Sequence, residues 1–297
     1  MKRYRLSLWR GIGSLPAAVL AATLLVGSAL PCAAQNKSPV DRWDLVLTGP
    51  KQEGLAVIEF FEEGFPPERT FSGYGIFVPK MKGVKGQNNR APTDPGRGTG
   101  SDTNAPSTQT NLFLIGPVNI DGRWNYDAKG RIIGTFSIEV TNFVTTNVTL
   151  YSVSFTGKAV PGRRLTLVAS TSGGRLTFRG VPYRDLTDLS FGVWNGIKKE
   201  GKQMFVELFS LWNRVDNSYE MVIETAPDYT AQGFAMVSAQ KKMAFALEEI
   251  PPNAEAGFLR ASIGPYREAP KKTTAKTKGF KEPDTQFKFD AVKVSDQ

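Results

Sequence analysis

The chain has 297 residues, of which 37 are Lys or Arg and 28 are Asp or Glu, so its formal net charge is +9. It has no His and a single Cys. The lack of His excludes Ser-His-Asp and Cys-His catalysis and His metal ligands, and one Cys excludes an internal disulfide and a thiolate zinc site. We therefore expect neither a metal nor a cofactor, and the composition favours a protein that is not an enzyme.

Residues 1–34 have the layout of a secretory signal peptide. Basic residues at the start precede an apolar stretch, and small residues lie just before a cleavage site between Ala34 and Gln35. The pattern predicts an exported protein, either periplasmic or secreted. Lipid attachment at Cys32 is the less favoured alternative, because Pro31 departs from the usual lipid-attachment sequence. No later segment has the roughly 18 consecutive apolar residues of a membrane helix, so we expect no membrane span in the mature chain.

The mature part of the chain consists of short runs that have the pattern of strands. Apolar and polar residues alternate over about four to eight positions, which is typical of a half-buried strand. Clusters of Gly, Pro, Asn and Asp separate the runs and predict turns. The predicted strands cover residues 43–48, 55–61, 70–78, 112–120, 123–126, 131–140, 148–158, 164–169, 175–181, 203–212, 219–225, 232–238, 243–248 and 257–263.

Two turns are predicted between residues 112 and 140. Asp121-Gly122 has the composition of a type I′ hairpin turn, and a second turn is expected at residues 127–130. This stretch is therefore predicted to be a three-stranded meander. Residues 185–199 give the weakest pattern and are compatible with a helical turn.

Roughly a dozen short strands without a long helical segment predict an all-β fold, an antiparallel meander that forms a barrel or a sandwich. A single β-rich domain is expected over residues 41–267. Residues 81–111 interrupt it with Gly, Asn, Pro, Ser and Thr, and are predicted to be a disordered loop. That loop is either a tolerated insertion or a mobile binding loop.

A faint internal echo leaves the number of β-units open. The sequence Val57-Ile58-Glu59 is followed by Gly73-Tyr74, and Val222-Ile223-Glu224 is followed by Gly233-Phe234. Trp43 precedes the first set and Trp212 precedes the second. Chance similarity in a strand-rich chain and two related β-units both explain the pattern.

The C-terminal segment, residues 268–297, is predicted to be a Lys-rich and mostly disordered tail. Five Lys residues occur between positions 271 and 281 with no acid between them. Such a segment is usually solvated, and its functional alternative is an electrostatic tether to an anionic envelope polymer or lipid surface. Residues 287–294 place Phe287 and Phe289 on alternate positions, which would allow one more strand at a sheet edge.

Paired carboxylates are the chemistry that remains open to a chain without His. A glycoside hydrolase would hold two of them about 5–10 Å apart. Nothing in the spacing selects a pair among the candidates, which are Asp121, Asp127, Glu139, Glu207, Glu220 and Glu224.

Aromatic side chains are the candidates for a binding site. Trp124 and Tyr126 lie two positions apart and share one face of a predicted strand. Tyr183 and Trp194 flank the segment with the weakest pattern. These four residues are predicted to line a ligand site, and the alternative is that they belong to the core.

The repeated phrases Phe155-Thr156-Gly157-Lys158 and Leu176-Thr177-Phe178-Arg179-Gly180, and the stretch from Gln240 to Phe245, resemble those of secreted bacterial β-rich proteins of no assigned function. The hairpin rhythm also looks like that of lipocalin-like barrels. Gly122-Arg123-Trp124 has the lipocalin Gly-x-Trp spacing but lies far from the start of the mature chain. No binding residues follow from this resemblance.

The leading functional expectation is a non-enzymatic exported module that binds an apolar or glycan ligand or another envelope component. The Lys-rich tail would contact an anionic envelope component. The first alternative is a structural or protein-interaction module without a small-molecule site, and the second is a carboxylate-based glycoside hydrolase. No nucleic-acid partner is expected, because the predicted signal peptide carries several of the positive charges.

Overall fold

The computed structural model describes residues 38–65, 67–80, 116–141, 148–171, 174–186, 190–225, 229–254, 257–269, 272–281 and 285–295. The predicted signal peptide with its cleavage site, and the predicted loop at 81–111, lie outside these residues. Within them the chain forms sixteen strands, which close into two antiparallel barrels of eight strands each. The all-β antiparallel prediction is therefore confirmed.

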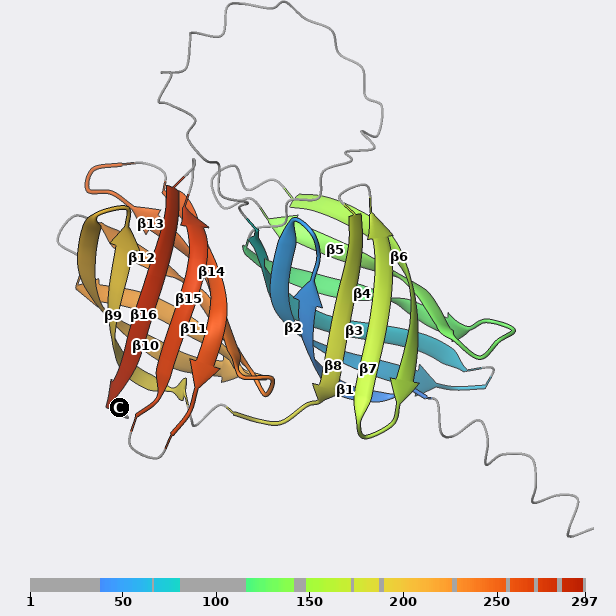
Figure 1. Cartoon of the computed structure of the whole chain (residues 1–297). Helices are drawn as coiled ribbons and strands as arrows, with labels where there is room; N and C mark the ends of the chain where they lie inside the picture. Colours follow the sequence, from blue (N-terminus) through green and yellow to red (C-terminus); the bar gives the residue numbers. More distant parts are fainter. Residues whose placement is uncertain are drawn as a thin grey trace, which may run out of the picture.

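The two barrels follow one another along the chain and lie side by side (Figure 1). Barrel 1 consists of β1 (Asp41–Thr48), β2 (Gln52–Glu63), β3 (Glu68–Pro79), β4 (Gly116–Tyr126), β5 (Ile132–Thr141), β6 (Val148–Val160), β7 (Arg164–Thr171) and β8 (Gly174–Pro182). Barrel 2 consists of β9 (Gly192–Glu200), β10 (Gln203–Val215), β11 (Ser218–Thr225), β12 (Thr230–Ser238), β13 (Lys242–Ile250), β14 (Phe258–Arg267), β15 (Thr274–Lys281) and β16 (Thr285–Ser295).

Closure of each barrel corrects two expectations about the domains. The single domain over residues 41–267 is instead one complete barrel followed by most of a second. Much of the predicted disordered tail forms β15 and β16, and β16 pairs with β9 to close barrel 2. The tail forms strands because Ala275, Phe287 and Phe289 alternate with its polar residues and are buried. In residues 185–199, Ser190 is helical, as the expected helical turn requires, and β9 begins at Gly192.

The predicted hairpin turn at Asp121-Gly122 is also wrong, since both residues lie within the continuous strand β4. A Cβ on Gly122 would lie 2.2 Å from the Thr135 carbonyl oxygen and 2.4 Å from the Phe71 ring. Gly122 is therefore required for close packing of neighbouring strands, which is the other common reason for Gly within a strand. The second predicted turn, at 127–130, is present: Gly130 has a φ of +69° and donates its N–H to the Asp127 carbonyl.

Each barrel is filled by apolar side chains, and each opens with an equivalent Trp. Trp43 and Trp194 are the third residues of β1 and β9, and both are 0% exposed. Trp43 donates its indole N–H to the Pro39 carbonyl at 2.7 Å, and Trp194 donates to the Ser190 carbonyl at 2.9 Å. The sequence echo had matched Trp43 with Trp212, which lies on the outer face of β10 and is 43% exposed. The two barrels therefore share an architecture in which Trp43 corresponds to Trp194, and not to Trp212 as the sequence echo indicated.

The barrels pack against each other through apolar residues on their outer faces. Barrel 1 contributes side chains from β1, β2 and β3, and barrel 2 contributes side chains from β12, β13 and β14. The buried residues are Val46, Leu55, Val57, Ile76, Val78, Met236, Ala244, Ala246, Ala261 and Ile263. Burial of outward-facing residues on both barrels explains why these strands lack the usual polar outer face.

Polar contacts fix the relative position of the barrels at the margin of this interface. The β10–β11 turn, Asp216-Asn217, has positive φ at both residues, as a type I′ turn requires. Asp216 forms an ion pair with Arg42, and its carbonyl accepts a hydrogen bond from the Tyr74 hydroxyl at 2.7 Å. Asp44, which is 1% exposed, accepts hydrogen bonds from the Ser238 hydroxyl at 2.7 Å and the Ala239 N–H at 2.6 Å.

Because the carboxyl group of Asp44 is buried, we expect it to make the stability of the protein fall as the pH rises. Burial raises its pKa to about 6, despite the two hydrogen bonds that favour the ionised form. Between its unfolded pKa of about 3.9 and this value, the unfolded chain loses a proton that the folded chain keeps. We therefore expect Asp44 to lower the free energy of unfolding by up to about 3 kcal/mol as pH rises through this window. Urea denaturation from pH 4 to 7 should show this fall in the wild type and not in Asp44→Asn.

The matched control for this titration is Asp121→Asn, because Asp121 lies on the exposed outer face of β4. The control should retain the pH dependence of the wild type. Equal slopes in wild type and Asp44→Asn would contradict the assignment.

Candidate functional site

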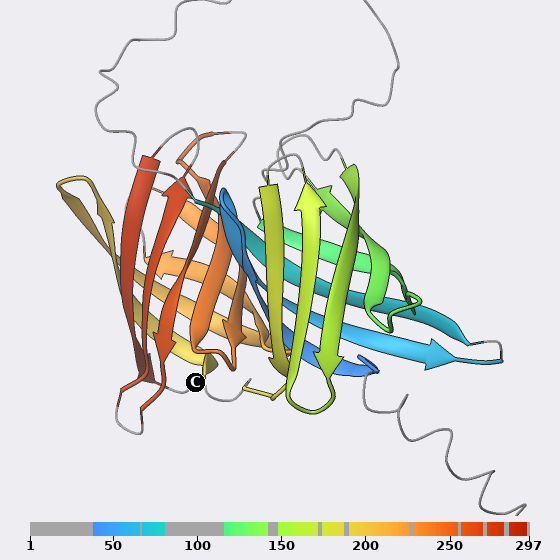
Figure 2. The ribbon, with the colours of Figure 1, turned by 45° about the vertical axis from the view of Figure 1, so that its right-hand side comes forward.

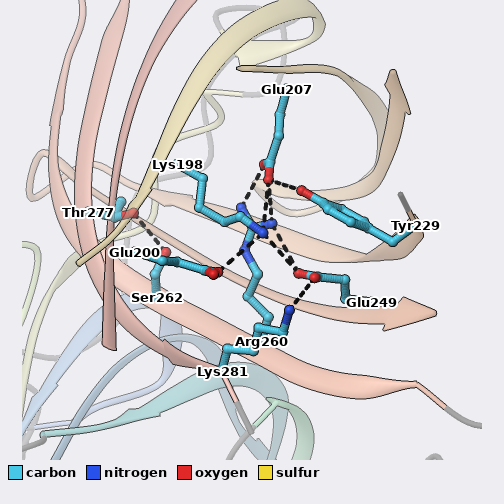
Figure 3. Close-up of polar contacts among 9 residues, drawn as sticks. All are labelled: Lys198, Glu200, Glu207, Tyr229, Glu249, Arg260, Ser262, Thr277 and Lys281. Atoms are coloured by element: carbon cyan, nitrogen blue, oxygen red, sulfur yellow. Dashed lines mark hydrogen bonds and ion pairs between the residues drawn. The ribbon is translucent and has the colours of Figure 1, made fainter. Parts of the chain in front are cut away.

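Barrel 2 contains a cluster of charged side chains at one end of its interior (Figure 3). Five strands contribute inward-facing ionisable residues close to where they meet the β9–β10, β13–β14 and β15–β16 connections. The cluster, called the ion cluster below, consists of Lys198, Glu200, Glu207, Tyr229, Glu249, Arg260 and Lys281. Lys198, Glu207, Glu249 and Arg260 are each at most 3% exposed.

The strongest contact of the ion cluster joins Arg260 and Glu207. The guanidinium group donates two parallel hydrogen bonds to the carboxylate, at 2.8 and 2.7 Å, which is the bidentate geometry that Arg favours. The Tyr229 hydroxyl also donates to Glu207. On its other side the guanidinium packs on the rings of Phe245 and Phe287, 5.4 and 4.9 Å from their centroids. Arg260 thus separates the charged end of barrel 2 from its apolar interior.

Lys198 joins the three carboxylates of the ion cluster. Its ammonium lies 3.2 Å from Glu200, 3.5 Å from Glu207 and 3.3 Å from Glu249. Glu249 also forms an ion pair with Lys281. Three cations therefore face three carboxylates, and the ion cluster has no net charge.

The pKa shifts of Glu207 and Arg260 reflect stabilisation of their charged forms within the ion cluster. Burial by itself raises the pKa of Glu207, but the charges of Arg260 and Lys198 and the hydrogen bonds from Arg260 and Tyr229 outweigh it and leave the pKa lowered. Burial lowers the pKa of Arg260, but Glu207 outweighs this effect, and the pKa is raised. A general acid for glycoside hydrolysis needs a raised pKa instead. The arrangement favours a structural role for the paired carboxylates.

A second group of charges lies on the outer face of barrel 2, where three lysines are direct neighbours on three adjacent strands. Lys278 on β15 is opposite Lys288 on β16, and Lys288 is opposite Lys199 on β9. Like charges in directly opposite positions destabilise a sheet by roughly 0.2–1 kcal/mol. We call Lys278, Lys288 and Lys199 the lysine row. Asp290 lies 3.2 Å from Lys199 and offsets part of the repulsion.

The lysine row faces a cleft between the barrels. The cleft has a volume of about 720 Å³, and barrel 1 contributes a fourth lysine, Lys80, together with Glu53. Glu53 also lies 3.8 Å from Lys242, so it is not available to the lysine row alone. Several flexible ammonium groups around an open cleft are suited to binding phosphate, sulfate or carboxylate groups.

A larger groove, of about 1060 Å³, lies on the outer face of barrel 1 over β3–β6. Its charged lining is mixed, with Arg69 and Arg123 beside Glu68 and Asp121. Trp124 also borders it but is only 3% exposed, so its ring has no free face for a sugar. The groove thus lacks both the charge of the cleft and an aromatic platform.

The aromatic residues predicted to line a ligand site do not gather in one place. Trp124 and Tyr126 share a face, as predicted, and their rings meet edge to face 5.4 Å apart within the core of barrel 1. Trp194 fills the core of barrel 2. Tyr183 borders the interface between the barrels, where the Arg42 guanidinium lies 5.3 Å from its ring centroid.

The candidate carboxylates are also dispersed. Glu207 belongs to the ion cluster, Asp121 lines the outer groove of barrel 1 and Asp127 forms hydrogen bonds within its turn. Glu220 borders a cavity of about 200 Å³ on the outside of barrel 2, and Glu224 accepts a hydrogen bond from Ser210. The side chain of Glu139 lies outside the described residues.

Sequence reasoning found part of the lysine row and missed the rest. Lys278 belongs to the predicted basic segment, whereas Lys199 and Lys288 were not singled out. The spacing of Lys276 and Lys278 indicates one exposed strand face, but only the pairing of β15, β16 and β9 brings Lys199 beside them. For the same reason, the sequence pattern did not indicate that Lys198 and Lys281 lie in one cluster.

Within the described ranges, no three His, Cys, Asp or Glu side chains are grouped so as to hold a metal ion. In the same part of the chain, no helix is long and apolar enough to cross a membrane.

No family model matches this chain, and no curated protein matches it. Among solved structures, the chain is similar to a protein from Bacteroides fragilis described as a "putative outer membrane protein". The identity is 10%, the similarity covers 88% of this chain and 99% of that chain, and the TM-score is 0.25. A TM-score this low supports no conclusion about fold or function.

Proposed function

We propose that this protein is an exported, non-enzymatic binding protein whose lysine row captures an anionic component of the cell envelope. The observation that supports this is the direct opposition of Lys278, Lys288 and Lys199 across three strands. Such an arrangement costs stability when nothing is bound. A bound anion would remove that cost, and the cleft of about 720 Å³ leaves room for it.

The positive charge of the cleft restricts which ligands can bind there. An apolar ligand is disfavoured at this site, because Lys80 and the lysine row surround the cleft. A glycan remains compatible if it carries sulfate, phosphate or carboxylate groups. A role as a protein-interaction module is an alternative, in which the anion would be an acidic protein surface.

The test compares binding of dextran sulfate with binding of neutral dextran by calorimetry. The triple variant Lys199→Gln, Lys278→Gln, Lys288→Gln should bind dextran sulfate about 3- to 150-fold more weakly, since each of the three exposed ion contacts contributes about 0.2–1 kcal/mol. Its stability should rise slightly, because the repulsion within the lysine row is removed.

The matched control removes three exposed cations from barrel 1, with Lys129→Gln, Lys158→Gln and Arg164→Gln. It makes the same change in net charge and should bind dextran sulfate nearly as well as the wild type. Equal weakening by both triple variants would show that only overall charge matters and would overturn the proposal. Equal binding of neutral dextran by the wild type would point to sugar recognition instead.

A further inference from the structure

Large apolar side chains are exposed on the outer face of the β9–β10 hairpin. Met204 is 69% exposed, Val206 is 66% exposed and Ile197 is 38% exposed. Val206 lies directly opposite Ile197, and Met204 follows on the same face of β10, opposite Lys199. The three side chains therefore form one apolar stripe, which ends at the turn formed by Gly201 and Lys202.

The apolar stripe lies outside the buried apolar interface with barrel 1. The interface with barrel 1 uses β12, β13 and β14, and β9 lies four strands from β13 in both directions around barrel 2. The β9–β10 hairpin also flares outward at the side of barrel 2, at the left of Figure 2. The fold thus presents these side chains outward and does not cover them with the other barrel.

Positive charge surrounds the apolar stripe. Lys202 is exposed at the hairpin tip, and Lys199 begins the lysine row beside Met204. An apolar stripe with lysines at its border matches the surface of an anionic bilayer, where apolar side chains reach the acyl boundary and cations contact headgroups.

We propose that the β9–β10 hairpin docks this protein onto an anionic lipid bilayer, with Ile197, Met204 and Val206 entering the boundary between headgroups and acyl chains. The inference rests on the proposed function of the lysine row, which would bind the headgroup phosphates. It identifies the anionic envelope component as lipid rather than as a soluble polymer, because a polymer offers no apolar phase to the stripe.

A second copy of this chain is a less suitable occupant of the stripe. In a symmetric dimer the same patch faces itself, so Lys199 and Lys202 would approach their own counterparts. Three side chains also form a small surface compared with the roughly 800 Å² that each partner buries in a stable protein interface. Charge complementarity favours the bilayer.

The test is co-sedimentation with vesicles of 30% phosphatidylglycerol and 70% phosphatidylcholine, compared with vesicles of phosphatidylcholine alone. The wild type should bind the anionic vesicles. The variant Met204→Gln, Val206→Thr should bind them at least 10-fold more weakly and should keep its affinity for dextran sulfate. The matched control, Val40→Thr with Val160→Thr, changes two exposed apolar residues of barrel 1 and should bind like the wild type.

The outcomes separate this inference from the proposed function. Binding of dextran sulfate without binding of anionic vesicles would overturn the inference and leave the proposed function intact. If the wild type binds neither dextran sulfate nor anionic vesicles, the proposed function is overturned as well. Vesicle binding that is unchanged in Met204→Gln, Val206→Thr would contradict insertion of the stripe. A dimer that this variant dissociates in analytical ultracentrifugation would assign the stripe to a second copy and likewise overturn docking on lipid.

Discussion

Replacing Arg260 with Met is expected to lower the free energy of unfolding by about 3–5 kcal/mol, because it leaves a buried carboxylate without its partner. Glu207 is 0% exposed and receives two hydrogen bonds from the Arg260 guanidinium. Lys198, at 3.5 Å, is shared with two other carboxylates and cannot replace a bidentate partner. Chemical denaturation of wild type and Arg260→Met would measure the loss.

Two further variants distinguish a buried charge from a general effect of losing an Arg. Arg123→Met removes a side chain that is 83% exposed and 3.8 Å from Glu68, so its effect should stay within about 0.5 kcal/mol. Arg260→Met combined with Glu207→Leu should recover much of the stability, since an apolar pair of similar volume avoids the desolvation of two charges. A double variant no more stable than Arg260→Met would contradict this explanation.

The pH dependence of Arg260→Met follows from the lowered pKa of Glu207. A lowered pKa stabilises the fold above the unfolded pKa of about 4.3, and this contribution is lost as pH falls through the folded value. The difference between wild type and variant should therefore shrink in acid, because a protonated Glu207 needs no guanidinium. This slope is opposite in sign to that of Asp44, whose pKa is raised.

Most of the fold was predicted from the alternation of apolar and polar residues, because burial of one face is a local property of each strand. It placed Trp124 and Tyr126 on one face and anticipated a strand at residues 287–294. The prediction was wrong where one residue type is common in two kinds of structure. Asp121-Gly122 is typical of a turn, yet Gly122 allows Phe71 and the backbone of β5 to approach within a strand. The many lysines of β15 suggested a solvated tail, although Ala275 and Phe280 between them are buried.

The candidate sites were harder to predict, because they depend on pairing between distant strands. Glu207 and Arg260 lie 53 positions apart, and Lys199 and Lys288 are neighbours only through the pairing that closes barrel 2. A sequence pattern states which face a residue occupies but not which residue lies opposite on the next strand. The ion cluster and the lysine row are therefore properties of barrel closure.

Replacing Trp194 with Ala is expected to destabilise the protein by about 3–5 kcal/mol, the usual cost of removing a large aromatic side chain from a core. Trp194 is 0% exposed, stacks on Phe209 with ring centroids 5.9 Å apart, and donates a hydrogen bond to Ser190. Trp43→Ala should have a similar effect in barrel 1. Trp212→Ala is the matched control, with an expected loss of less than about 1.5 kcal/mol, since this side chain is 43% exposed.

The pair Trp43→Ala and Trp194→Ala also tests whether the barrels unfold as one unit. The shared apolar interface and the hydrogen bonds to Asp44 couple them, so each variant should shift the same single transition in thermal denaturation. Two transitions, of which each variant shifts only one, would show that the barrels unfold independently. Coupling would matter for the proposed binding of an anion, because Lys80 of barrel 1 and the lysine row of barrel 2 border the same cleft. The relative position of the two barrels sets the distance between Lys80 and the lysine row, and the proposed anion would have to fit that distance.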